Sequence, residues 1–123
     1  MATLRFLPAD DPRLLKHIDT IRSRLSKDGW LFRYQLDDGF GNPTVAFIIC
    51  TFWLIEALVA TRRSMEGVEI MKQAISVLSP LGLLSEDYDT STGRMWGNYP
   101  QCYSHVGLIN AAFAASPGWS TIL

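Results

Sequence analysis

The sequence has few of the residues that build metal sites and disulfides. Its 123 residues include two histidines and two cysteines, Cys50 and Cys102, with no Cys-x-x-Cys pair. Cys102 and His105 lie close together, but two candidate ligands do not make a metal site. Because each cysteine lies in an apolar or aromatic stretch, we expect two buried, reduced thiols, no metal or cofactor, and a cytoplasmic protein.

An excess of charge of one sign is also lacking. The chain carries 11 basic and 12 acidic residues, a formal net charge of −1, so it has no field that would gather phosphates or an anionic membrane. The apolar run from Val45 to Ile55 ends at Glu56 and is shorter than the ~20 residues that cross a bilayer. We therefore expect neither a nucleic acid partner nor a membrane partner.

Several catalytic motifs are missing as well. The chain has no phosphate-binding glycine loop, no nucleophile elbow and no His-Glu-x-x-His motif. Phosphoryl transfer, acyl transfer and zinc-dependent hydrolysis therefore find no support in the sequence.

Hydrophobic residues make up 48% of the chain, enough for one folded core, so we treat residues 1–123 as a single segment. Two amphipathic helices are predicted. The first begins at the N-cap and proline of Asp11-Pro12 and ends before Gly29, and the other runs from Ser64 to about Leu78. Their apolar stripes are Leu14, Ile18, Ile21 and Leu25 in the first helix and Val68, Met71, Ile75 and Leu78 in the other.

Two further helices are apolar nearly all round. They run from about Thr44 to Thr61 and, after a cap at Ser104, from His105 to about Ala115. A strand is the alternative for the β-branched start of the former. The order predicts an all-α fold of two outer-inner hairpins. Two amphipathic helices cannot cover two apolar ones, so we expect a bare flank on each inner helix, covered by further polypeptide or by self-association.

A long loop follows each outer helix. Each loop begins at a glycine, Gly29 or Gly82, and is rich in Asp, Gly, Asn, Pro and aromatic residues. Loops of this length are usually functional. Antiparallel neighbours place both loops at the same end of the helices. The two glycines are 53 residues apart, and in that register Arg33 falls opposite Glu86, so a cation and a carboxylate should share one mouth.

The first loop offers groups that suit sugar hydroxyls. Arg33 presents a fork of hydrogen-bond donors, and Tyr34 follows it in the chain. The alternative for Arg33 is an ion pair with Asp37 or Asp38. For Glu86, in the second loop, the alternatives are a catalytic carboxylate and a solvated loop residue.

The second loop adds an aromatic residue and two amides. Trp96 suits stacking on a pyranose ring or packing against protein, and Asn98 and Gln101 suit either hydroxyl binding or turns. The run from Asp87 to Asn98 is similar to a calcium loop, but its glycine, Gly93, comes one position late and the last position is not Glu. We interpret that run as a turn without a metal.

In four motifs the chain resembles the carboxy-terminal end of glycoside hydrolase family 15, the glucoamylase and bacterial trehalase group. The motifs occur in the right order and are DGWLFRYQLDDGFG, AFIICTFWLIEAL, GLLSEDYD and GNYPQCYSHVGLINAA. The resemblance runs from about Phe6 to Ala115. It implies an (α/α)₆ toroid, of which this chain is the carboxy-terminal portion with about the last two helix pairs.

The resemblance also implies an inverting glycosidase acting on α-glucosides. In such enzymes a carboxylic acid protonates the glycosidic oxygen while a carboxylate ~6.5–9.5 Å away activates water. Glu86 matches the family's general base, and the general acid belongs to an upstream segment outside this chain. We therefore expect a carbohydrate substrate for the parent protein and no activity from the chain alone. The alternative is a non-catalytic helical-hairpin binding module.

Overall fold

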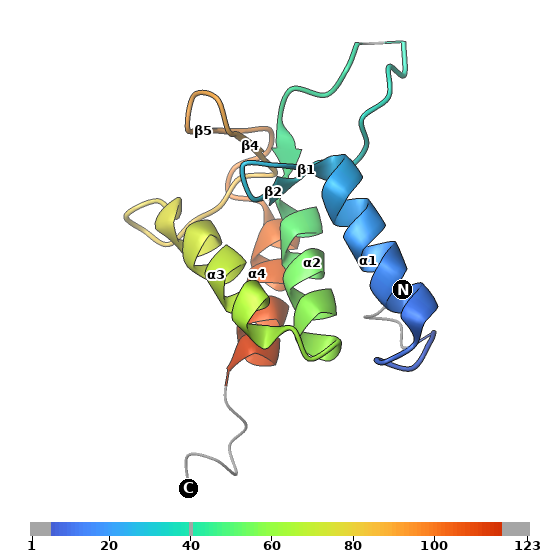
Figure 1. The fold of residues 1–123 in the computed structure, drawn as a ribbon. Helices are drawn as coiled ribbons and strands as arrows, with labels where there is room; N and C mark the ends of the chain where they lie inside the picture. The colour runs from blue at the N-terminus through green and yellow to red at the C-terminus, as the bar shows by residue number, and fades with distance from the viewer. Residues whose placement is uncertain (1–5, 40, 117–123) are drawn as a thin grey trace, which may run out of the picture.

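The computed structural model of the chain describes residues 6–39 and 41–116 (Figure 1). Four α-helices are joined by loops that contain short β-strands, so the prediction of four helices is confirmed and the strands are an addition to it. The elements in chain order are α1 (Pro12–Leu25), β1 (Ser26–Lys27), β2 (Trp30–Leu31), β3 (Ala46–Phe47), α2 (Ile48–Ala60), α3 (Ser64–Ser76), β4 (Asp87–Asp89), β5 (Arg94–Trp96) and α4 (Cys102–Ala115).

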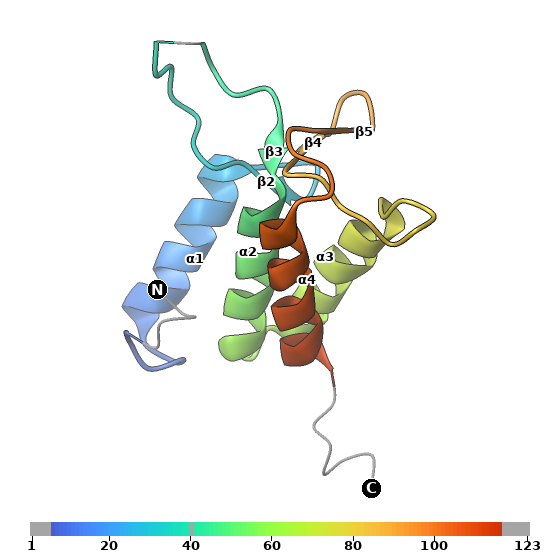
Figure 2. The same cartoon turned by 180° about the vertical axis from the view of Figure 1, so that it is seen from behind.

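The helices alternate in direction along the chain. In Figures 1 and 2, α2 lies between α1 and α3. Helix α4 packs against α2 and α3 on the face that is turned away from the viewer in Figure 1 and toward the viewer in Figure 2. All five strands and both long loops lie at one end of the helices, and the short turn from α2 to α3 lies at the other. The prediction that the two long loops share an end is therefore confirmed.

Helix α1 begins where the sequence predicts. The side chain of Asp11 caps the helix by accepting the Arg13 N–H at 2.8 Å, and Pro12 occupies the first turn. The Arg13 guanidinium beside it lowers the pKa of Asp11 to about 2. Leu14 and Ile18 of the predicted stripe are buried.

Helix α2 is the centre of the core. Seven of its side chains are buried, which agrees with its nearly continuous apolar sequence; its first turns begin at Ile48, later than Thr44, because Ala46 and Phe47 form strand β3. Both neighbouring helices approach α2 at a glycine. A Cβ on Gly67 of α3 would lie 3.1 Å from the Val59 side chain, and one on Gly107 of α4 would lie 3.1 Å from Phe52.

Helix α3 is amphipathic as predicted, but its inward face is rotated from the predicted stripe. The buried residues are Gly67, Ile70, Met71 and Ala74, whereas Ile75 is 48% exposed. The close approach at Gly67 sets this rotation, since the smallest residue of the helix faces α2. Hydrophobic spacing alone did not identify a glycine as part of the buried face.

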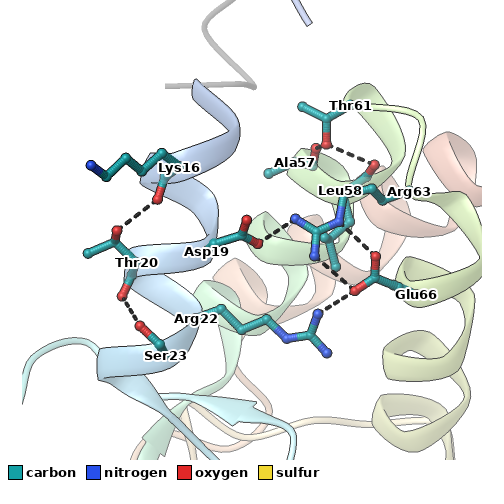
Figure 3. Close-up of polar contacts among 10 residues, drawn as sticks. All are labelled: Lys16, Asp19, Thr20, Arg22, Ser23, Ala57, Leu58, Thr61, Arg63 and Glu66. Atoms are coloured by element: carbon teal, nitrogen blue, oxygen red, sulfur yellow. Dashed lines mark hydrogen bonds and ion pairs between the residues drawn. The ribbon is translucent and has the colours of Figure 1, made fainter. Parts of the chain in front are cut away.

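Ion pairs join α1 to α3 across the surface (Figure 3). Arg63, just before α3, donates to Asp19 of α1 at 2.6 Å and to both carboxylate oxygens of Glu66. Arg22 of α1 donates to the same Glu66 at 2.5 Å. These hydrogen bonds from Arg63 and Arg22 lower the pKa of Glu66 to about 2. Two outer elements far apart in sequence are thereby connected through charge.

Helix α4 has a bare apolar flank, as expected for an inner helix without full cover. It begins at Cys102, three residues before the predicted start, so Ser104 lies buried inside the helix rather than at its cap. The exposed fractions of Val106, Ile109 and Phe113 are 45%, 60% and 72%. This flank, with Tyr103, is called the α4 flank below.

The α4 flank continues onto α2. Trp53 of α2 is also exposed and meets the ring of Tyr103 edge to face, with centroids 5.8 Å apart. Trp53 lines an apolar groove of about 260 Å³ between α1 and α2. Helix α2 thus also has an exposed flank, as expected for an inner helix.

The expectation of two buried thiols is half wrong. Cys50 is partly buried, and burial raises the pKa of its thiol to about 11. Cys102 is exposed because it is the first residue of α4, at the edge of the packed helices. Within residues 6–39 and 41–116, no helix combines the length and apolar character needed to cross a membrane.

Replacing Gly107 with Ala should destabilise the chain by about 1–3 kcal/mol, because the new methyl group would overlap Phe52 and Ile49 of α2. Urea unfolding followed by circular dichroism measures this loss. Asn110→Ala, at an exposed position of the same helix, serves as the control and should leave the midpoint nearly unchanged. Equal midpoints for Gly107→Ala and the original chain would contradict the close helix approach.

The isolated chain should self-associate through the α4 flank, since exposed apolar area of this kind is removed from water on contact. Light scattering should give a mass above that of the monomer, rising with concentration. The double substitution Ile109→Lys and Phe113→Lys should return the chain to a monomer. A monomer at high concentration without these substitutions would contradict the prediction.

Candidate active site

A three-stranded antiparallel sheet joins the two long loops. Strand β3 ends the first loop, and it pairs with β4 of the second loop, which in turn pairs with β5. The register places Phe47 opposite Asp87, and Asp87 opposite Trp96. The sheet therefore holds the two loops in a fixed position relative to each other. The 53-residue register predicted that the loops meet, and the strand pairing shows how they are joined.

Buried contacts attach the first loop to the same frame. The hydroxyl of Thr51, inside α2, accepts the Leu31 N–H at 2.9 Å. The ring of Trp30, which is buried, lies 4.5 Å from the ring of Tyr88 in β4. Both loops are thus fixed to α2 and to each other before they reach the surface.

Glu86 is held by its backbone on both sides. Its N–H donates to the Asn98 carbonyl at 2.9 Å, and its own carbonyl accepts from the N–H of Ile48, the first residue of α2, at 3.1 Å. Its side chain accepts from the Asn98 amide at 2.8 Å. The carboxylate therefore has a fixed position relative to the central helix, and it is neither sealed in the core nor on a free loop.

Gly97 lies directly beneath two carboxylates. A Cβ at this position would lie 3.0 Å from Oε2 of Glu86 and 3.1 Å from Oδ2 of Asp87. Its φ of +76° also favours glycine. Both carboxylate oxygens thus lie within 3.1 Å of one point, and only glycine leaves them room there.

The two loops enclose a cleft of about 360 Å³. Polar residues of both loops line it, together with residues 41–45, which lead into β3. Its lining residues are Arg33, Tyr34, Asp38, Gly41, Asn42, Pro43, Thr44, Val45, Phe47, Glu86 and Asp87. The predicted meeting of Arg33 and Glu86 at one mouth is therefore found.

Arg33 and Tyr34 have separate partners in the cleft. The Arg33 guanidinium carbon lies 5.6 Å from the centroid of the Phe47 ring, a cation–π contact. The hydroxyl of Tyr34 donates to the Asp38 carboxylate at 2.6 Å, and this hydrogen bond raises the pKa of Tyr34. The arginine thus lies over an aromatic ring beside the carboxylates.

The three predicted residues of the second loop lie in different places. Asn98 contacts Glu86 directly. Trp96 is 53% exposed on β5, outside the cleft lining but directly across the strand from Asp87. Gln101 is partly buried at the start of α4, where its N–H donates to the Leu84 carbonyl. Sugar binding by Trp96 and Gln101 stays a prediction.

Asp87 belongs to the cleft and was not predicted. Burial, with a contribution from the neighbouring charge of Glu86, raises the pKa of its carboxyl to about 6, while Arg33 acts in the opposite direction. The sequence placed this residue in a turn. The turn does exist, two residues later, where the Asp89 carboxylate accepts from Ser91 and Thr92. An adjacent pair of acids before an alternating strand was the available signal for Asp87.

The histidine beside the site has a structural partner. Nε2 of His105 accepts the backbone N–H of Leu84 at 3.2 Å, which supports the start of the Glu86 loop. No group of three or more His, Cys, Asp or Glu residues suited to a metal ion occurs in the described part of the chain. The polar side chains that line the cleft are carboxylates, an arginine, and hydroxyl and amide groups.

Curated proteins with similar sequences carry the name trehalase. The chain is 41% identical to a trehalase of Mycolicibacterium smegmatis and 39% identical to one of Mycobacterium tuberculosis, each over 110 residues, 87% of this chain. It is 38% identical over 110 residues, 89% of its length, to a trehalase of Thermoplasma volcanium. The resemblance read from the four motifs is thus confirmed for trehalases.

The chain spans only a small part of these relatives. The match covers 16% of the two mycobacterial proteins and 18% of the Thermoplasma protein. No protein-family model matches the chain, and no solved structure matches it significantly.

Asp87→Asn should stabilise the chain at neutral pH. Because the folded pKa of about 6 exceeds the ordinary 3.8, stability falls as the pH rises between these values, and the loss is complete above about pH 6. The substitution should restore about 1 kcal/mol at pH 7.5 after allowance for solvent screening, or about 4–8 °C in melting temperature, and less at pH 5.

Asp89→Asn is the matched control for that measurement. Hydrogen bonds from Ser91 and Thr92 lower the pKa of Asp89 to about 2, so its ionised form stabilises the fold at pH 7.5. The control should therefore lower the melting temperature. Destabilisation by both substitutions would contradict the uncompensated burial of the Asp87 charge.

Proposed function

Because this chain is homologous to a segment of the trehalases, we propose that it is the carboxy-terminal part of an inverting glycoside hydrolase that cleaves trehalose or another small α-glucoside. The observation that supports the proposal is the position of Glu86. Its carboxylate lies at a cleft between two loops, is fixed through the backbone to the central helix, and stands beside donors and acceptors suited to sugar hydroxyls. Glu86 matches the general base of the resembling family.

In the proposed reaction Glu86 acts as the general base. Its carboxylate takes a proton from a water molecule as the water oxygen attacks the anomeric carbon, while the bond to the leaving glycosidic oxygen breaks. The Asn98 amide holds Oε2 of Glu86 in place, which leaves the other oxygen for the water. Asn98 is therefore a positioning residue in this scheme.

The general acid is proposed to come from outside this segment. Asp87 is the second carboxylate beside Glu86, but one oxygen of each lies within 3.1 Å of the same point above Gly97. That places them closer together than the ~6.5–9.5 Å that an inverting enzyme needs to admit water between its acid and base. Asp87 is thus unsuited to the acid role across the substrate.

The two helix pairs fit a place in an (α/α)₆ toroid. The α4 flank and the groove beside Trp53 are apolar surfaces that further helices of such a toroid would cover. In that arrangement the other helices would also bring the missing acid to the loop end. A binding module without chemistry would use the same surfaces, and the fixed carboxylate of Glu86 at the cleft supports the catalytic proposal.

The decisive test uses the full-length protein that carries this segment. Glu86→Gln should lower kcat for trehalose by about 10²–10⁴-fold, since removal of a general base has that effect, with the melting temperature unchanged. The matched control is Glu69→Gln, an exposed position on α3 paired with Lys72, which should retain full turnover. Undiminished turnover by Glu86→Gln would contradict the assignment. The isolated chain should hydrolyse nothing, and activity from it alone would contradict the argument for an external acid.

A further inference from the structure

Three side chains form a row across the sheet. Phe47, Asp87 and Trp96 are opposite one another on β3, β4 and β5, and residues in register share a face of the sheet. The adjacent row, Ala46, Tyr88 and Met95, packs on the core side. The Asp87 row therefore faces outward, with the carboxylate between two aromatic side chains.

Arg33 adds a cation to this row. Its guanidinium lies over Phe47, and its charge partly opposes the rise in the pKa of Asp87 that burial and Glu86 cause. Among the described residues no ion pair joins the two groups, and neither side chain takes part in a hydrogen bond. The cleft thus contains unused donors and unused acceptors, at a separation too large for direct contact.

We propose that Asp87 and Arg33 together bind hydroxyl groups of the sugar unit that lies in the cleft, which makes Asp87 a specificity-determining residue beside the general base. A hydroxyl both donates and accepts, so one placed between the two side chains can donate to the Asp87 carboxylate and accept from Arg33. Neither a carboxylate ligand nor an ammonium ligand satisfies both partners in this way. The inference rests on the proposed function.

The aromatic neighbours fit the same ligand. Phe47 and Trp96 flank Asp87 across the strands: Phe47 lines the cleft beneath Arg33, and Trp96 lies next to the cleft, outside its lining. A pyranose ring has apolar C–H faces and a rim of hydroxyls, so the row matches both of its surfaces. Trp96 is 53% exposed, which leaves room for a sugar ring beside it.

Protonation of Asp87 should alter this binding. Three titratable or charged groups interact electrostatically with Asp87. They are Glu86 in its own loop, Arg33 in the first loop and the Cys50 thiol on α2. Below a pH of about 6 the carboxyl becomes protonated and loses acceptor capacity. Affinity for the sugar should therefore weaken on the acid side.

The test measures Asp87→Asn in the full-length protein with trehalose and its monodeoxy analogues. Because the substitution removes a hydrogen bond to a charged group, kcat/KM should fall about 10- to 100-fold, mainly through a higher KM. In the original protein KM should fall as the pH rises from 5 to 7, and in Asp87→Asn this pH dependence should disappear. One deoxy analogue should be equally poor for the original and the substituted protein, because the missing hydroxyl is the one that Asp87 binds. Arg33→Gln should give the same insensitivity to that analogue.

Asp89→Asn, the same substitution two residues further along β4, should leave KM and the analogue pattern unchanged. If Asp87→Asn loses the same factor with every analogue, its effect is structural and the inference is overturned. If Glu86→Gln abolishes turnover while Asp87→Asn behaves as the original protein, the inference fails and the proposed function stands. If the protein turns over no α-glucoside, both fail.

Discussion

The site depends on two backbone hydrogen bonds that hold one residue. Glu86 donates to the Asn98 carbonyl and accepts from the first N–H of α2, so its position is set by the start of the central helix rather than by the length of its own loop. A helix start offers free N–H groups, and here one of them is used to fix a neighbouring loop. Any shift of α2 would move the carboxylate, and the buried contacts of α2 with α3 and α4 oppose such a shift.

Helix periodicity and loop length were sufficient to predict four helices and the common end of both loops, and the 53-residue spacing of Gly29 and Gly82 predicted the meeting of Arg33 with Glu86. They were insufficient where the structure depends on pairs of residues far apart in sequence. The strand pairing of Phe47 with Asp87 leaves no signal in two- or three-residue strands, and the close contact at Gly67 rotates α3 away from its apolar stripe. The exposure of Cys102 follows from where α4 begins: the N-cap is Gln101, whose side chain makes no capping hydrogen bond, so the predicted cap at Ser104 placed the start of the helix too late.

The cleft is also a place where the chain gives up stability. Asp87 is partly buried beside a like charge, and no described side chain donates a hydrogen bond to it, so ionisation is unfavourable there. Gly97 has a positive φ and no side chain to pack. A buried charge without a hydrogen-bonding partner is typical of a site in which a ligand supplies the partner, and Asp87 lines the cleft.

The ion pairs between α1 and α3 give the first helix a different kind of attachment from the other three. Helices α2, α3 and α4 meet through close apolar packing, which salt does not screen, whereas Asp19, Arg22, Arg63 and Glu66 are largely at the surface, where salt screens charge strongly. Although Leu14 and Ile18 also pack α1 into the core, ionic strength should therefore weaken the contact between α1 and α3 more than the apolar contacts among the other helices. The first loop, with Arg33, follows directly from α1. High salt or acid that weakens the ion pairs of α1 would therefore shift the position of Arg33 at the cleft, although the residues that line the cleft stay the same.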